Sequence, residues 1–128
     1  MRRQLMWLFL VVITVLMPAL VGAVTEADFE AKTTQHLLNL CTAPPTEPRY
    51  REAIHFCHGY LVGAYHYHMA QTDGEGGKPL VCLPAPPPSR NEAIRMFIAW
   101  AQAHPQYMNE RPVETEFRFL TEKWPCQN

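Results

Sequence analysis

The sequence predicts a small all-α domain, an antiparallel four-helix bundle cross-linked by two disulfides. Three observations support this prediction. Apolar residues recur at three- and four-residue steps in four stretches, which is the spacing of one helix face. Prolines and glycines separate these stretches, and short connections of this kind join antiparallel neighbours in helical bundles. Four cysteines follow a segment typical of export, where an even number of cysteines indicates disulfides.

The chain begins with a predicted secretory signal peptide, residues 1–23. Two arginines precede an almost wholly apolar run, 5–16, and the small residues 21–23 offer a cleavage site. An uncleaved anchor helix is the alternative, but the apolar run is short for a membrane span. We therefore expect an exported protein whose mature part is one domain, residues 24–128.

The charge balance disfavours two classes of partner. Removing Arg2 and Arg3 with the signal peptide shifts the formal net charge from −1 to −3. A mildly acidic domain is poorly suited to bind nucleic acid or an anionic membrane surface. Neither is expected as a partner of the mature protein.

The first predicted helix covers residues 26–40, and Thr25 can cap its start. A weak apolar stripe follows this stretch, formed by Phe29, His36, Leu37 and Leu40. Three prolines within 42–48 prevent the helix from continuing.

The central predicted helix covers residues 50–70. No proline interrupts it, and one face carries Ile54, Cys57, Leu61, Ala64 and His68. Gly59 and Gly63 lie four residues apart on an adjacent face, although each glycine costs a helix about 1 kcal/mol relative to alanine. We expect these glycines to allow close packing of another backbone or of a large aromatic side chain.

The third predicted helix begins at Ser89, because Ser89-x-x-Glu92 is a capping-box pattern, and it ends before Pro105. The fourth begins near Pro112, which suits a first helical turn, and ends before Pro125. Its apolar stripe has steps of four, three and four residues and consists of Val113, Phe117, Leu120 and Trp124.

The four cysteines permit three disulfide pairings. In an antiparallel bundle Cys41 and Cys57 flank the same turn, whereas Cys82 and Cys126 fall near the opposite end. This arrangement favours the pairs Cys41–Cys57 and Cys82–Cys126. Each disulfide is expected to contribute about 2–4 kcal/mol by restricting the unfolded chain.

The segment 71–88 is long for a connection in a domain of this size and holds both glycines and a proline run. A disulfide at Cys82 would lower the entropy of the segment, which suits a preorganised contact element. The alternative is a merely tethered connection. The predicted partner-binding residues are Asp73, Glu75, Lys78, Leu83, Pro84 and Pro86.

The central helix also carries residues capable of metal binding or nucleophilic chemistry. His55 and His58 share a face, His66 lies roughly 16 Å from them along the axis, and His68 points to the other side. None of these spacings matches a zinc motif, so no metal site is predicted. Cys57 lies between two histidines, but neither neighbour points toward it on a helix, so a disulfide explains it better than a nucleophile.

Three carboxylates surround the fourth helix, at Glu110, Glu114 and Glu116. Glu114 and Arg118 are spaced as an i,i+4 ion pair, which indicates an ordinary solvated face. Nothing in the pattern separates the pKa values of two carboxyl groups, as an acid–base pair requires. We therefore predict no catalytic residue, no cofactor and no enzymatic activity.

The tyrosines of the central helix allow two interpretations. Tyr60, Tyr65 and Tyr67 combine an aromatic body with a polar tip, and such residues are enriched at interfaces. They also cover small cores. The sequence favours the covering role slightly.

Four short motifs follow one another in the order Cys57-x-Gly59-Tyr60-x-x-Gly63, Cys82-Leu83-Pro84, His104-Pro105 and Trp124-Pro125-Cys126. In this combination the chain resembles the Rap/Tai-type immunity proteins of type VI secretion, over roughly residues 37–126. The resemblance implies a periplasmic helical protein that binds and blocks a peptidoglycan-cleaving amidase effector delivered by sister cells. It is compatible with a monomer or a homodimer.

Two alternatives come from other classes of protein. The six histidines are suited to a charge switch near pH 6, which would fit a periplasmic acid-stress chaperone. The second alternative is a metal or redox carrier, which would use the histidines or the cysteines. An immunity protein acting by steric occlusion requires neither, because it depends on rigidity and shape.

Overall fold

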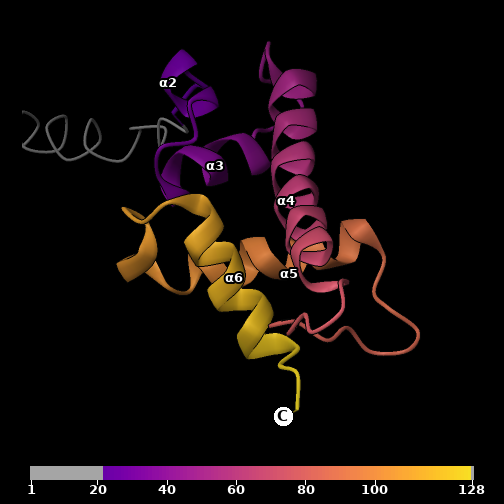
Figure 1. Ribbon diagram of the computed structural model, residues 1–128. Coiled ribbons are helices and arrows are strands. Elements are labelled where there is room, and N and C mark those ends of the chain that lie inside the picture. The colour runs from indigo at the N-terminus through magenta and orange to yellow at the C-terminus, as the bar shows by residue number, and fades with distance from the viewer. Residues whose placement is uncertain (1–21, 128) are drawn as a thin grey trace, which may run out of the picture.

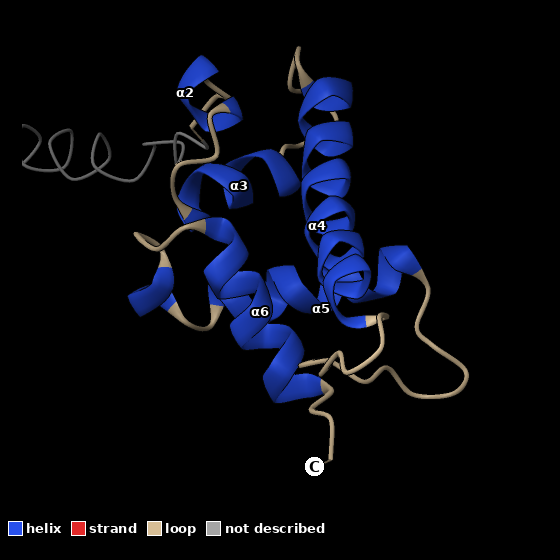
Figure 2. Cartoon of the chain, viewed as in Figure 1, coloured by secondary structure: helices blue, strands red, loops and turns tan. Residues whose placement is uncertain are grey.

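The computed structural model describes residues 22–127, and within this range the secondary structure is helical (Figures 1 and 2). The predicted signal peptide falls almost wholly on residues 1–21, outside the described part. The elements, in chain order, are α2 (Glu26–Phe29), α3 (Thr34–Cys41), α4 (Tyr50–Thr72), α5 (Arg90–Gln102), the 3₁₀ helix η2 (Pro105–Tyr107) and α6 (Pro112–Lys123). None of these helices combines the length and the apolar character that crossing a membrane requires.

The single helix predicted over residues 26–40 is wrong, because two helices, α2 and α3, occupy this stretch. Ala31 adopts a positive φ of 46° between them, which a continuing helix does not allow. Thr33 then begins the second helix, as its side chain accepts a hydrogen bond from the His36 N–H (3.3 Å).

The buried carboxylate of Asp28 completes the start of α2. It accepts hydrogen bonds from the Thr25 N–H (2.7 Å), the Thr25 hydroxyl (2.8 Å) and the Asn39 amide of α3 (2.8 Å). Burial would raise the pKa of Asp28, but these hydrogen bonds outweigh it and lower the pKa. Thr25 thus caps the first helix, as predicted, through a capping box.

The long helix α4 agrees with the central helix of the sequence analysis and extends it to Thr72. The side facing the core carries Ala53, Cys57 and Leu61. Gly59 and Gly63 lie on an exposed side, and a Cβ added at either would meet no atom within 4 Å. The expected close packing at these glycines is therefore absent among residues 22–127.

The starts of α5 and α6 follow the local signals in the sequence. The Ser89 hydroxyl accepts a hydrogen bond from the Glu92 N–H (3.2 Å), and Pro112 is the first residue of α6. A buried hydrogen bond joins α6 to α3 between the hydroxyls of Thr34 and Thr115 (2.7 Å). This bond fixes the two short helices against each other inside the core.

Both predicted disulfides are confirmed. Cys41 pairs with Cys57 and Cys82 pairs with Cys126. The first joins α3 to α4, and the second joins the segment after α4 to the chain after α6. The core between these links consists mainly of Leu37, Leu38, Leu40, Ala53, Leu61, Phe97, Ala101, Phe119 and Leu120.

The antiparallel arrangement of the expected bundle is not confirmed. Figure 1 shows α3 and α5 lying across the long direction of α4 rather than along it. The all-α class and the two disulfides are confirmed, and the packing is that of short helices set against one long helix.

Candidate functional site

The histidines of α4 do not converge on a common point. His55 and His66 are exposed, whereas His68 is half-buried against the Phe117 ring (5.1 Å between centroids) and its Nε2 accepts the Leu80 N–H (3.3 Å). In residues 22–127 no group of three or more His, Cys, Asp or Glu side chains is placed to hold a metal ion. Cys57 is bound in a disulfide and offers no thiol.

The tyrosines of α4 divide between the two roles considered for them. Tyr60 and Tyr65 are partly buried and pack against the core, and burial raises the pKa of each phenol. Tyr67 is 67% exposed. Only Tyr67 therefore presents its ring to solvent.

The segment between α4 and α5 is exposed along most of its length but fixed at one point. Val81 is buried and forms an isolated bridge with Pro125, and the Cys82 N–H donates to the Trp124 carbonyl (2.9 Å). The disulfide Cys82–Cys126 reinforces the same point. Figure 1 shows the later part of the segment, which leads into α5, looping away from the helices.

Five of the six predicted contact residues are exposed on this segment, at Asp73, Glu75, Lys78, Pro84 and Pro86. Leu83 is half-buried and turns toward the helices. The sequence analysis missed Leu80, a large apolar side chain that is 57% exposed. The sequence shows only that Leu80 and Val81 point to opposite sides of an extended segment, and the structure shows that Val81 is the buried one.

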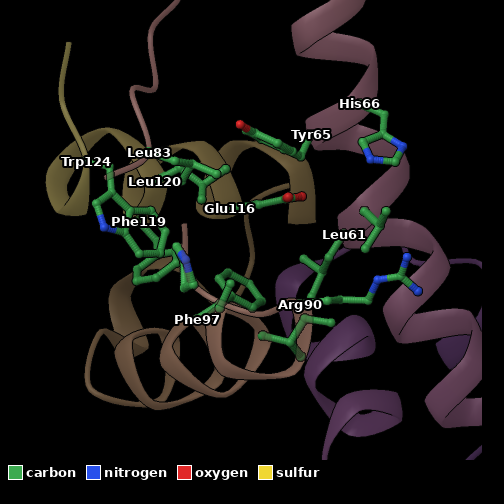
Figure 3. Close-up of a pocket in the computed structure, with 14 residues that line it drawn as sticks. Leu61, Tyr65, His66, Leu83, Arg90, Phe97, Glu116, Phe119, Leu120 and Trp124 are labelled. Carbon is green, nitrogen blue, oxygen red and sulfur yellow. The ribbon is translucent and has the colours of Figure 1, made fainter. Parts of the chain in front are cut away.

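A cleft of about 180 Å³ lies beside the fixed part of this segment (Figure 3). Helices α4, α5 and α6 form its walls, and the loop segment contributes Leu83 and Pro88. The lining is mostly apolar, and Leu61, Phe97, Phe119, Leu120 and Trp124 supply much of it. Among the polar groups of the lining, Arg90 and His66 are exposed.

Glu116 is the unusual member of this lining. The residue is only 4% exposed, and its Oε2 has no hydrogen-bond partner in the described part of the chain. Figure 3 shows the carboxyl group pointing from α6 into the space bordered by Tyr65 and Leu61. Burial raises the pKa of Glu116 to about 9, so this side chain is a neutral carboxylic acid at pH 7.

Nothing in the sequence pattern separated the pKa of Glu116 from those of Glu110 and Glu114, but burial does so in the folded protein. The expected Glu114–Arg118 pair is wrong. Arg118 instead makes a two-pronged contact with Glu110 (2.8 and 2.9 Å), and Glu114 pairs with Arg111 (2.6 Å). The signal that would have found Glu116 is its spacing, since it lies four residues before the buried Leu120.

A family model describes most of this chain. The model of the Rap1a immunity proteins matches residues 33–126, a range that runs from the cap of α3 to the second disulfide. No curated protein and no solved structure matched. Because the match spans well over half of the sequence, the chain belongs to the Rap1a immunity protein family.

Proposed function

We propose that this protein acts in the periplasm as the immunity partner of a peptidoglycan amidase delivered by type VI secretion. It binds the amidase directly and prevents self-intoxication and intoxication by sister cells. Membership of the Rap1a immunity family supports an effector-immunity role and the expectation of a cognate effector as partner. Two disulfides suit a protein that works outside the cytoplasm.

The observation that carries the proposed mechanism is the exposed segment 73–88 with its fixed base. Most of its side chains are accessible, while Val81 and Cys82 hold it to the end of α6. An interface element that is already ordered loses less conformational entropy on binding than a flexible one. The segment is therefore suited to enter the substrate cleft of an enzyme and exclude the substrate.

The chemistry of the segment also fits a contact surface. Leu80 provides an exposed apolar side chain, and Lys78 and Glu75 supply charges of both signs nearby in the sequence. Apolar anchors surrounded by polar groups dominate the binding energy of protein interfaces. Inhibition by occlusion needs these features and no reactive group.

The test is inhibition of any peptidoglycan amidase that is encoded beside the gene of this protein. Leu80→Asp should weaken binding at least about tenfold, because an apolar anchor is replaced by a charge. Val113→Asp introduces the same charge at an exposed apolar position on α6 and should leave the affinity unchanged. Both variants should keep the wild-type melting temperature within a few degrees. Failure of the wild-type protein to bind or inhibit the amidase would overturn the proposal.

A further inference from the structure

The cleft beside Glu116 contains a polar group that the fold itself does not use. The rest of the lining is mostly apolar, with Tyr65 half-buried and Arg90 and His66 exposed, yet Glu116 Oε2 lies buried without a partner among the described residues. Buried polar atoms in native proteins are nearly always hydrogen-bonded, so an exception needs an explanation. A ligand that brings its own hydrogen-bonding group into the cleft would supply one.

We propose that this cleft is an anchor pocket for a phenolic side chain, a tyrosine, presented by the effector. This inference rests on the proposed function and adds to it the pocket and the chemistry of the anchor. Four arguments support it: the size of the cleft, its charge, the hydrogen-bonding capacity of Glu116 and the position of the cleft beside the contact segment.

The size of the cleft fits one aromatic ring. A cavity of about 150 Å³ in a protein core is large enough to bind benzene, and the cleft here measures about 180 Å³. The faces and edges of Phe97 and Phe119, whose ring centroids lie 5.9 Å apart, offer an aromatic wall for such a ring.

The charges around the cleft disfavour an ionic occupant. Arg90 lines the cleft and forms no ion pair among the described residues, so an ammonium or guanidinium group would be repelled. A carboxylate would lose its hydration on entering the apolar part of the cleft, and Arg90 could pair with it only at the exposed edge. An uncharged polar tip avoids both penalties.

A phenol matches the remaining capacity of Glu116. The protonated carboxyl group offers one O–H donor and an acceptor oxygen, and a phenol offers the same pair of functions. A hydrogen bond between them would satisfy the oxygen that is otherwise unpartnered. A plain phenyl ring would fill the same volume but leave that oxygen unsatisfied.

The cleft is continuous with the proposed contact segment. Leu83 and Pro88 belong to the segment and also line the cleft, which places both surfaces within one footprint. An effector seated on Leu80 and its neighbours can therefore reach the cleft with one projecting side chain. This continuity favours the effector over a free small molecule as the source of the phenol.

The first experiment uses p-cresol and toluene, the analogues of the tyrosine and phenylalanine side chains. NMR titration of the full mature protein should show saturable shifts of amides in α4, α5 and α6 around the cleft. We expect p-cresol to bind about tenfold more tightly than toluene, the factor that one net hydrogen bond provides. Glu116→Leu should abolish or reverse this preference. No saturable shift at the cleft, or equal binding of both probes by the wild type, would overturn the phenol assignment.

Two substitutions at alanine positions of α5 test whether p-cresol binds in the cleft. Ala93 lines the cleft, so Ala93→Phe should fill it and remove p-cresol binding. Ala99 is exposed on the same helix and outside the lining, so Ala99→Phe should bind p-cresol as the wild type does. If Ala93→Phe proves unfolded by circular dichroism, the Glu116→Leu result decides the question alone.

The second experiment identifies the source of the phenol. Ala93→Phe should weaken binding of the adjacent amidase at least tenfold, and Ala99→Phe should not. If Ala93→Phe loses p-cresol but binds the amidase normally, the anchor role is wrong while the proposed function stands. If the wild-type protein binds no amidase, the proposed function fails and the effector is removed as the source, although p-cresol binding would still show a phenol pocket.

Discussion

Glu116 couples the stability of the protein to pH. Its pKa is about 9 in the folded protein because of burial, against an ordinary value of 4.5. The folded state therefore holds a proton that the unfolded state has lost between about pH 4.5 and pH 9. The contribution of Glu116 to stability is greatest below the lower value and falls as pH rises, by up to about 1.4 kcal/mol for each pH unit. The polar groups facing this carboxyl from the neighbouring helices are Tyr60, Tyr65, His66 and Arg90.

This coupling gives the first residue-scale prediction. Glu116→Gln keeps the shape of the side chain but cannot ionise, so it should raise the free energy of unfolding at pH 8 by about 2 kcal/mol or more. At pH 5 it should differ little from the wild type. Urea denaturation across this range measures the difference, with the exposed Glu75→Gln as control. If the free energy of unfolding changes with pH in the same way for the wild type and Glu116→Gln, the carboxyl group is solvated in the folded state.

The residue scale is also where prediction from sequence was weakest. A glutamate among other charged residues is ordinarily solvated, and the sequence analysis treated all three glutamates of this region alike. What separates Glu116 is the rotation of α6, which buries Thr115, Glu116 and Phe119 and leaves Val113 37% exposed. The spacing of Glu116 from Leu120 is compatible with this rotation, but the packing of α6 against the neighbouring helices decides it.

At the scale of the element, α4 contains two glycines that lower its helix stability and that alanine could replace. Gly59 and Gly63 have open space where a Cβ would lie, and each costs the helix about 1 kcal/mol relative to alanine. Gly59→Ala and Gly63→Ala should therefore each raise the free energy of unfolding by about 0.5–1 kcal/mol. Thermal or urea denaturation measures the change.

A third glycine provides the control for this prediction. Gly76 adopts a φ of +79° in the turn after α4, a conformation that side chains disfavour. Gly76→Ala should therefore destabilise the protein although its Cβ also meets no atom. Loss of stability at Gly59→Ala would mean that a partner or a second copy covers this face of α4.

Element boundaries were predictable where a local signal sets them. The capping serine at Ser89 and the proline at Pro112 fixed the starts of α5 and α6 within a residue or so. The division of the first helix was not foreseen, because Thr33 as a cap and Ala31 at positive φ resemble ordinary helical residues in the sequence. The Asn39 amide of α3 donates to Asp28 of α2, a contact between the two helices that the local sequence does not show.

At the scale of the whole molecule, the two disulfides have different roles. The loops they close differ in length, 16 residues for Cys41–Cys57 and 44 for Cys82–Cys126. Chain-entropy estimates give about 3 and 4 kcal/mol of stabilisation respectively. Only the second fixes the exposed contact segment. The pairing was predictable from the order of the elements, whereas the crossing directions of the helices depend on side-chain packing and were not.

The corresponding prediction compares two double variants. Replacing Cys41 and Cys57 with serine, or Cys82 and Cys126 with serine, should lower the free energy of unfolding by about 3–4 kcal/mol in each case. Only the second change should also speed hydrogen exchange in 73–88 and weaken amidase binding. Equal losses of amidase affinity in the two folded variants would contradict a special role for this segment.

The unequal spacing of the two cross-links also orders events during biogenesis. Ribosomes synthesise a polypeptide from its amino end, so Cys57 becomes available to Cys41 after only 16 further residues have appeared. Cys82 must wait for 44 more, which carry α5 and α6. The surface proposed to meet the toxin is therefore the last part to mature. An incompletely synthesised chain can therefore already carry the Cys41–Cys57 disulfide while the contact segment is not yet fixed by Cys82–Cys126.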